Sequence, residues 1–314
     1  MRRRHALTVL LVLVVAGCAS PEPRTGGIPL AEPSPTPGPA LPVATPSAAP
    51  VPSATPAPAT KPPATRQPPP VVEKTGPAPL NCTGTATIDR PPATGSGPLG
   101  SRTTTGSNAV ALTFDDGPDP INTPRILDLL KQCGVHATFC VNGVKVQLYP
   151  DVIRRIHAEG HALCNHTWRH IRQLGTYGQP RITQDLTDTN NAIHAIVPDA
   201  AISYFRAPSG TWSDDYLAVC AAMSMTPIHW DVDPSDWQSE VWGTGASMVN
   251  HIVEVVQGNV RPGSIVLSHD YQKPDTTAAY RILLPWLKAR FTLIALPPGG
   301  IVTTTAMGPA QPAN

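Results

Sequence analysis

Short apolar runs alternate with amphipathic segments from about residue 108 to residue 296, and this alternation limits the folds open to the chain. Seven runs have the length and composition of strands, at 109–114, 136–141, 161–164, 202–205, 226–232, 264–268 and 292–296. Helical patterns lie between them, at 123–133, 150–159, 182–197, 213–223, 245–257 and 276–290. The order predicts an α/β fold with a parallel sheet, and seven strands are nearly enough for a closed barrel.

The helix after the first predicted strand has clear end signals. Thr123 is expected to cap its N-terminus, Pro124 suits the first turn, and Gly134 can end it.

The N-terminus resembles a secretory signal of the lipoprotein type. Arg2, Arg3 and Arg4 precede an apolar run at 6–16 that is shorter than the ~20 residues a membrane span needs. The residues before Cys18 resemble a bacterial lipobox, which implies removal of 1–17 and acylation of Cys18. Ordinary signal cleavage nearby is the alternative.

A segment at 18–80 rich in Pro, Ala, Thr and Ser follows and cannot bury a core. We expect it to be a disordered, partly extended spacer that holds a domain away from the membrane. Residues 81–107 form a poorly defined lead-in, and 301–314 a flexible tail. The net charge of +1, without a basic stripe, gives no indication of nucleic-acid binding. The expected location is extracytoplasmic, lipid-anchored to the cell membrane and reaching into the wall.

Cysteine pairing stays open at the level of sequence. If Cys18 is acylated, an odd number of cysteines remains, so at least one is free or pairs between molecules. The cysteines that remain are Cys82, Cys133, Cys140, Cys164 and Cys220. All of them except Cys82 lie in apolar segments, where core packing is as good an interpretation as bridging.

Polar residues gather where the predicted strands end. Two adjacent carboxylates, Asp115 and Asp116, follow the first strand, and like charges this close resist ionising together. Because the carboxyl ends of parallel strands share one face, we expect these groups to form one site. The other groups are 165–170, 206–210, 231–237 and 268–270.

The spacing of His166 and His170 favours a metal site. On one helical turn it would aim both imidazoles at one point, and two histidines plus a carboxylate form a common catalytic zinc set. Asp116 lies on the same face, and a divalent cation there would ease ionisation of Asp115, which could then act as a base towards an activated water. Structural histidines are the alternative.

Three further groups fit hydrolysis. Arg206 can orient one carboxylate through two hydrogen bonds, although a structural salt bridge is the alternative. His269 can protonate a leaving amine, with Asp236 holding its ring, although a buried core histidine is the alternative. Trp237 and Leu267 fit either a small pocket wall or plain core.

These residues together resemble the NodB-type polysaccharide deacetylases, carbohydrate esterase family 4. The resemblance covers about residues 108–296 and includes five motifs in order. They read TFDDGP at 113–118, HTWRH at 166–170, RAPSG at 206–210, DPSDW at 233–237 and LSHD at 267–270.

The resemblance implies a distorted (β/α) barrel of about seven parallel strands, over a deacetylase domain at 108–300, and hydrolysis of N-acetyl groups on amino sugars. It implies that Asp116, His166 and His170 bind a divalent metal, usually zinc. Asp115 would be the base and His269 the acid.

The remaining roles also follow from the resemblance. Arg206 would orient Asp115, and Asp236 would tune His269.

The resemblance further assigns substrate-binding residues. Trp237 and Leu267 would line the acetyl pocket, and the backbone N–H of Ser209 would help to stabilise the oxyanion. The family usually has an aromatic residue where Ser209 stands, so sugar stacking at this position is in doubt.

The sequence therefore predicts a metal-dependent hydrolase that removes N-acetyl groups from an extracellular polysaccharide. The anchor and spacer favour peptidoglycan over soluble oligosaccharides, and a chitin-like glycan is the other candidate substrate. Cobalt or nickel would suit the same ligands as zinc. An O-deacetylase, such as an acetylxylan esterase, and a non-catalytic wall-binding protein that keeps the fold remain alternatives. A zincin-type protease is disfavoured because no Glu lies between His166 and His170.

Overall fold

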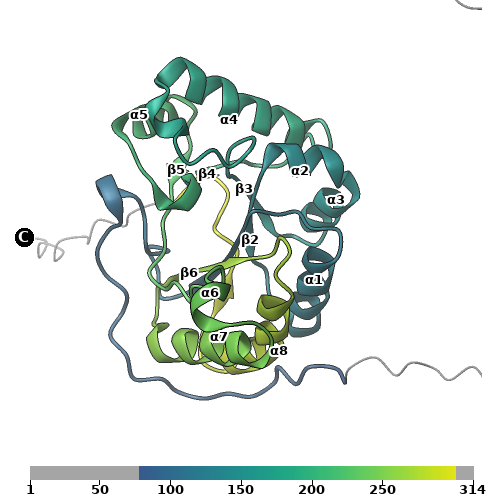
Figure 1. Cartoon of the computed structure of the whole chain (residues 1–314). Helices are drawn as coiled ribbons and strands as arrows, with labels where there is room; N and C mark the ends of the chain where they lie inside the picture. The colour runs from purple at the N-terminus through teal and green to yellow at the C-terminus, as the bar shows by residue number, and fades with distance from the viewer. Residues whose placement is uncertain (1–77, 302–314) are drawn as a thin grey trace, which may run out of the picture. The chain divides into compact units, whose positions relative to one another are not determined.

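The computed structural model describes residues 78–301, and its centre is a curled sheet of parallel strands (Figure 1). The strands are hydrogen-bonded in the order β5-β4-β3-β2-β1-β6, and β7 pairs with the first residues of β1. This arrangement confirms the predicted α/β barrel class. The strands are β1 Val110–Asp115, β2 Thr138–Val141, β3 Ala162–Asn165, β4 Tyr204–Phe205, β5 Thr226–Pro227, β6 Ile265–His269 and β7 Leu293–Ile294.

The segment after β5 crosses from one edge of the sheet to the other. β5 pairs with β4, whereas Val232 forms a parallel bridge with Val266 of β6. The predicted strand at 226–232 is therefore shorter than expected, because the chain leaves β4 to reach β6. The sheet is a curled, incompletely closed barrel.

Helices surround this sheet (Figure 1). The six predicted helices are present within a few residues of their expected ends, and α2 and α6 are short additions. Within residues 78–301, no helix is both long and apolar enough to cross a membrane. The helices are α1 Asn122–Cys133, α2 Gly143–Leu148, α3 Pro150–Ala158, α4 Gln179–His194, α5 Asp214–Ala222, α6 Ser239–Trp242, α7 Ala246–Asn259 and α8 Pro274–Lys288.

The start of α1 differs from the sequence prediction. Thr123 lies inside the helix, and its hydroxyl donates to Asp270. The carboxylate of Asp119 instead accepts the backbone N–H groups of Ile121 and Asn122. The predicted end is confirmed, since Gly134 has a left-handed φ of 57° that glycine adopts without strain.

Alternation along β1 decides what faces the barrel interior. Val110, Leu112 and Phe114 belong to the large apolar cluster that includes residues of α1, α7 and α8. Successive side chains of a strand point to opposite faces, so Thr113 and Asp115 point into the barrel. A strand buried on both faces thus carries a carboxylate into the interior at its carboxyl end.

The lead-in from residue 78 is well defined and wraps around the outside of the barrel (Figure 1). Its backbone amides bond to the carbonyls of Ala289 and Pro262. Disulfides join Cys82 to Cys133 and Cys140 to Cys164, and Cys220 is free and buried. The second disulfide joins residues that are direct partners in the β2–β3 register.

The predicted signal segment, Cys18, the proline-rich arm up to residue 77 and the tail from residue 302 lie outside the described residues.

Candidate active site

The carboxyl ends of the strands meet at a pocket of about 340 Å³. Arg206 and Asp236 do not line it but lie buried directly behind it, with 0% and 3% of their surface exposed. The other site residues predicted from the sequence all line the pocket: Asp115, Asp116, His166, His170, Ser209, Trp237, Leu267 and His269.

The three predicted metal ligands converge. The Nε2 atoms of His166 and His170 each lie 3.5 Å from Oδ1 of Asp116. All three ligand atoms lie within 4.8 Å of one another. A tetrahedral zinc ion holds its ligands at about 2.0–2.2 Å, which places neighbouring ligand atoms roughly 3.4 Å apart. The observed spacing fits a divalent cation.

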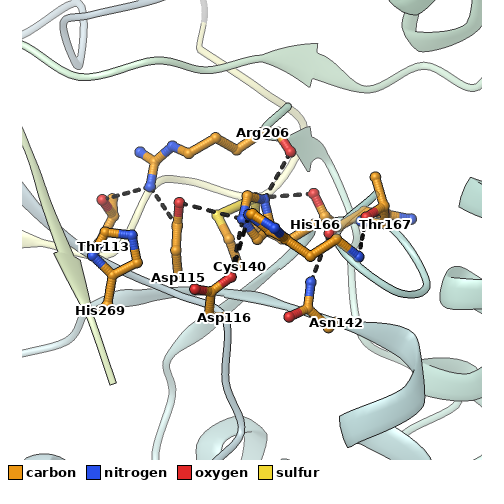
Figure 2. A network of polar contacts seen from close by, with 12 residues as sticks. Thr113, Asp115, Asp116, Cys140, Asn142, His166, Thr167, Arg206 and His269 are labelled. Carbon is orange, nitrogen blue, oxygen red and sulfur yellow. Dashed lines mark hydrogen bonds and ion pairs between the residues drawn. A yellow bond between two sulfur atoms is a disulfide. The ribbon is translucent and has the colours of Figure 1, made fainter. Parts of the chain in front are cut away.

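The two histidines lie on a loop after β3, so their predicted placement on one helical turn is wrong. The loop passes through left-handed backbone at Thr167 and His170, with φ of 67° and 55°. Nδ1 of His166 lies 2.8 Å from the carbonyl of Arg206 (Figure 2). Because a carbonyl only accepts, Nδ1 carries a proton, and Nε2 is the ring nitrogen that faces Asp116.

A sharp turn aims Asp116 away from the line of β1. Its φ is 74°, a left-handed value that non-glycine residues rarely adopt. Nζ of Lys145 donates to its backbone carbonyl at 2.6 Å and lies 3.4 Å above the ring of Tyr271. A Cβ on the next residue, Gly117, would come within 2.5 Å of the Asp270 carboxylate. The turn therefore needs both the glycine and the lysine contact.

The charge of the site also suits a cation. Oδ1 of Asp116 is buried and has no hydrogen-bond partner in the described part of the chain. Burial opposes ionisation of Asp116, but contact with His166 and the other nearby histidines outweighs this and holds its pKa well below the usual range. Asp115 places a second carboxylate 3.7 Å from His166. Buried carboxylates of this kind are stabilised by pairing or by metal coordination.

Asp115 is held by a buried arginine (Figure 2). Nη1 of Arg206 donates to Oδ1 of Asp115 at 2.6 Å and to the Thr113 hydroxyl at 2.9 Å. Nη2 donates instead to the carbonyl of His229. The expected pair of hydrogen bonds to one carboxylate is therefore wrong. One bond fixes Oδ1, and Oδ2 is left facing the metal ligands.

His269 and Asp236 form a second ion pair. It lies on the other side of Asp115 and Asp116 from the two histidines of the candidate metal site. Nδ1 of His269 lies 2.6 Å from Oδ1 of Asp236, whose other oxygen accepts from the His269 backbone N–H and the Thr276 hydroxyl. Burial disfavours the imidazolium, but Asp236, together with Asp116 and Asp115, raises the pKa of His269 to about 9. The imidazole is therefore protonated at neutral pH, as a general acid requires.

The apolar wall of the pocket is formed by Trp237 and Leu267. Trp237 is 49% exposed, which fits a binding surface better than core. Ser209 lies on the 3₁₀ turn η3, Pro208–Gly210, with a left-handed φ of 53°.

Sequence reasoning missed several residues of the site. Trp230, Asp233 and Arg172 also line the pocket, and Thr276 supports Asp236 from α8. Asp233 lies in the polar segment 231–237 at the end of a predicted strand, which was a usable signal, whereas Trp230 lies within that predicted strand. Arg172 and Thr276 carried no local signal, because an isolated Arg or Thr is common on surfaces and helices.

Comparisons with known proteins agree with this geometry. Residues 102–228 match the polysaccharide deacetylase family model. A chitooligosaccharide deacetylase of Sinorhizobium fredii is 39% identical over 209 residues, which are 62% of this chain and 94% of that protein. A peptidoglycan-N-acetylglucosamine deacetylase of Bacillus cereus is 34% identical over 57% of this chain and 81% of that protein.

Solved structures agree as well. The crystal structure of a peptidoglycan N-acetylglucosamine deacetylase with a bound hydroxamate (an N-oxidanyl-benzamide) is 31% identical, with a TM-score of 0.54 over 61% of this chain and 88% of that one. The five motifs meet in one pocket, and the similarities of sequence and fold point the same way. The chain therefore belongs to the polysaccharide deacetylase family of hydrolases, which act on N-acetyl amide bonds.

Proposed function

We propose that the protein is a metal-dependent deacetylase that removes N-acetyl groups from the amino sugars of peptidoglycan. The observation that carries this proposal is the meeting of Asp116, His166 and His170 within 4.8 Å, in one pocket with Asp115 and His269. The relatives named above act on chitooligosaccharides or on peptidoglycan N-acetylglucosamine. Peptidoglycan is favoured because the predicted anchor and spacer would place the enzyme at the wall.

Asp116, His166 and His170 would hold the divalent cation, with zinc the expected ion. When bound, such a cation lowers the pKa of water and stabilises negative charge on a carbonyl oxygen. Loss of a ligand is expected to reduce metal binding sharply, because even outer-sphere partners contribute about 10–100-fold to affinity.

The chain's own residues would carry the proton transfers. Asp115 is fixed through Oδ1 by Arg206. It takes a proton from the attacking water while the water oxygen forms a bond to the acetyl carbonyl carbon. His269, held protonated by Asp236, gives a proton to the sugar nitrogen as the C–N bond breaks. Acetate and a free amino sugar result. The base gains one proton and the acid loses one, and proton exchange with solvent returns both groups to their starting states before the next turnover.

Other residues would position the acetyl group. Trp237 and Leu267 provide an apolar surface for the methyl group. The backbone N–H of Ser209 would donate to the oxyanion, and because it is a backbone group, the loss of the usual aromatic side chain leaves this role intact.

The two alternatives are less well supported. A non-catalytic wall-binding protein has no need for a protonated His269–Asp236 pair beside a free Asp116 oxygen. An O-deacetylase would use the same residues, so it is distinguished from an N-deacetylase only by the substrates from which acetate is released.

The first test measures acetate release. The purified full chain is expected to release acetate from peptidoglycan and from N-acetylglucosamine oligomers, with little release from acetylated xylan. Chelator should abolish release, and added zinc or cobalt should restore it. Release from acetylated xylan alone would overturn the N-deacetylase assignment in favour of the esterase.

A pair of variants separates chemistry from metal binding. Asp115→Asn keeps the shape and can still accept from Arg206, so we expect near-normal metal affinity and a kcat lower by about 10²–10⁴. His166→Ala should lose metal affinity by more than about 100-fold and lose turnover with it. Competition with a chromophoric chelator measures affinity, and thermal melting controls for folding. Full activity in either variant contradicts the assigned roles.

The pH dependence tests the acid. His269 has a raised pKa of about 9, so its protonated form, and with it kcat/KM, is expected to fall as pH rises through that value. Asp236→Asn removes the attracting charge and should move this alkaline limb about 1–3 units lower. An unshifted limb would show that another group controls it.

We also propose that the protein is a lipid-anchored, extracytoplasmic enzyme. The two disulfides support an oxidising compartment. Cys18→Ser is expected to move the protein from the membrane fraction to the medium or periplasm, measured by fractionation and immunoblotting. Unchanged membrane localisation would overturn the role of Cys18.

A further inference from the structure

Arg172 is a pocket-lining cation that no described residue neutralises. It lies two residues after His170, is exposed and lines the catalytic pocket. Among residues 78–301 no carboxylate or carbonyl is recorded as its partner. Arg206 differs, since both of its terminal guanidinium nitrogens are engaged, Nη1 by Thr113 and Asp115 and Nη2 by the His229 carbonyl. Arg172 is therefore free to bind something outside the chain.

The loop around Arg172 is anchored, so the guanidinium is presented from a fixed base. Leu174 is fully buried, and Ile171 packs against the same apolar cluster. Tyr216 of α5 and Ala207 belong to this cluster as well. The anchors on both sides of Arg172 hold the backbone against the segment that carries the pocket residue Ser209.

The pocket has one apolar side and one cationic side. Trp237 and Leu267 are close to β6, whereas Arg172 and Ser209 follow β3 and β4. The sheet order β4-β3-β2-β1-β6 places the carboxylates of β1 between these two sides. If the acetyl methyl group occupies the apolar side, the remainder of the glycan extends towards Arg172.

The small side chain of Ser209 adds room on the cationic side. Ser209 and Gly210 form the neighbouring pocket wall, where a large side chain would narrow the space. An N-acetylated sugar is neutral, so it offers a guanidinium hydrogen-bond acceptors but no negative charge to pair with. A carboxylate matches the planar fork of arginine through two parallel hydrogen bonds.

We infer that Arg172 selects glycans that carry a carboxylate close to the N-acetyl group that is removed. The inference rests on the proposed deacetylase function and narrows its substrate to acidic N-acetylated glycans, such as those with a carboxyalkyl ether on a neighbouring sugar. Arg172 is a specificity-determining residue and takes no part in the proton transfers. Neutral oligomers remain substrates, bound without this contact.

Steady-state kinetics on three substrates test the inference. They are a neutral N-acetylglucosamine tetramer, a peptide-free peptidoglycan tetramer with free ether carboxylates, and the same tetramer with those carboxylates converted to methyl esters. For the wild type we expect a KM about tenfold lower for the acidic tetramer than for its ester, with equal kcat, because a charge-assisted contact made before and during reaction changes binding alone.

Arg172→Gln should raise KM for the acidic tetramer about tenfold and leave the neutral and esterified tetramers unchanged. Arg172→Lys should recover part of the effect, since it keeps the charge without the fork. Arg181→Gln is the matched control, because it removes an exposed arginine nearby that does not line the pocket.

The outcomes separate this inference from the proposed function. Equal KM values of the wild type for the acid and its ester, or an equal rise for all substrates in Arg172→Gln, would overturn the role of Arg172 while deacetylation stands. No acetate release from any substrate by the metal-loaded wild type would overturn the deacetylase proposal, and the inference with it.

Discussion

A buried arginine at the centre of the barrel organises the site. The guanidinium of Arg206 is fully buried and bonds to Thr113 and Asp115 on β1. Its backbone carbonyl accepts from Nδ1 of His166, and its second terminal nitrogen reaches the carbonyl of His229. A charge withdrawn from water is tolerated only when it is paired and hydrogen-bonded, so these contacts form as one unit. The orientation of the candidate base and that of one candidate metal ligand are therefore set by the same residue.

The surroundings of the site lower the pKa of one titratable group and raise the pKa of another. Asp116 is held ionised by nearby histidines, whereas His269 is held protonated by Asp236. This difference arises from topology, because β1 supplies the carboxylates and the adjacent β6 supplies the imidazole, with Asp115 and His269 as direct register partners. Two neighbouring parallel strands thus place the proposed base and the proposed acid side by side without any long-range adjustment of the chain.

The fold and most site residues were predictable because they depend on periodicity. The alternation along β1 that buries Leu112 sends Asp115 inward, and strand polarity brings the distant motifs to one face. Loop conformation was not predictable, since four-residue spacing fits both a helical turn and the left-handed loop of His166 and His170. The cap of α1 was misassigned because Thr123 is used by Asp270, a tertiary contact that outweighs local preference. Disulfide pairing was out of reach because the Cys140–Cys164 pair depends on the β2–β3 register and the Cys82–Cys133 pair on the path of the lead-in past the end of α1.

The lead-in segment limits how far this protein can be truncated from its N-terminal side. The amide of Arg102 bonds to the carbonyl of Pro227, and the carbonyl of Thr103 accepts from the amide of Ile265, so this short stretch fills the seam between the two free edges of the sheet. A shortened version that begins at Asn108 would leave both edges open, and unpaired strand edges are where chains stick to one another. The minimal folding unit for recombinant work therefore includes the residues from Arg102 onward, before the first strand, which is also where the family match begins.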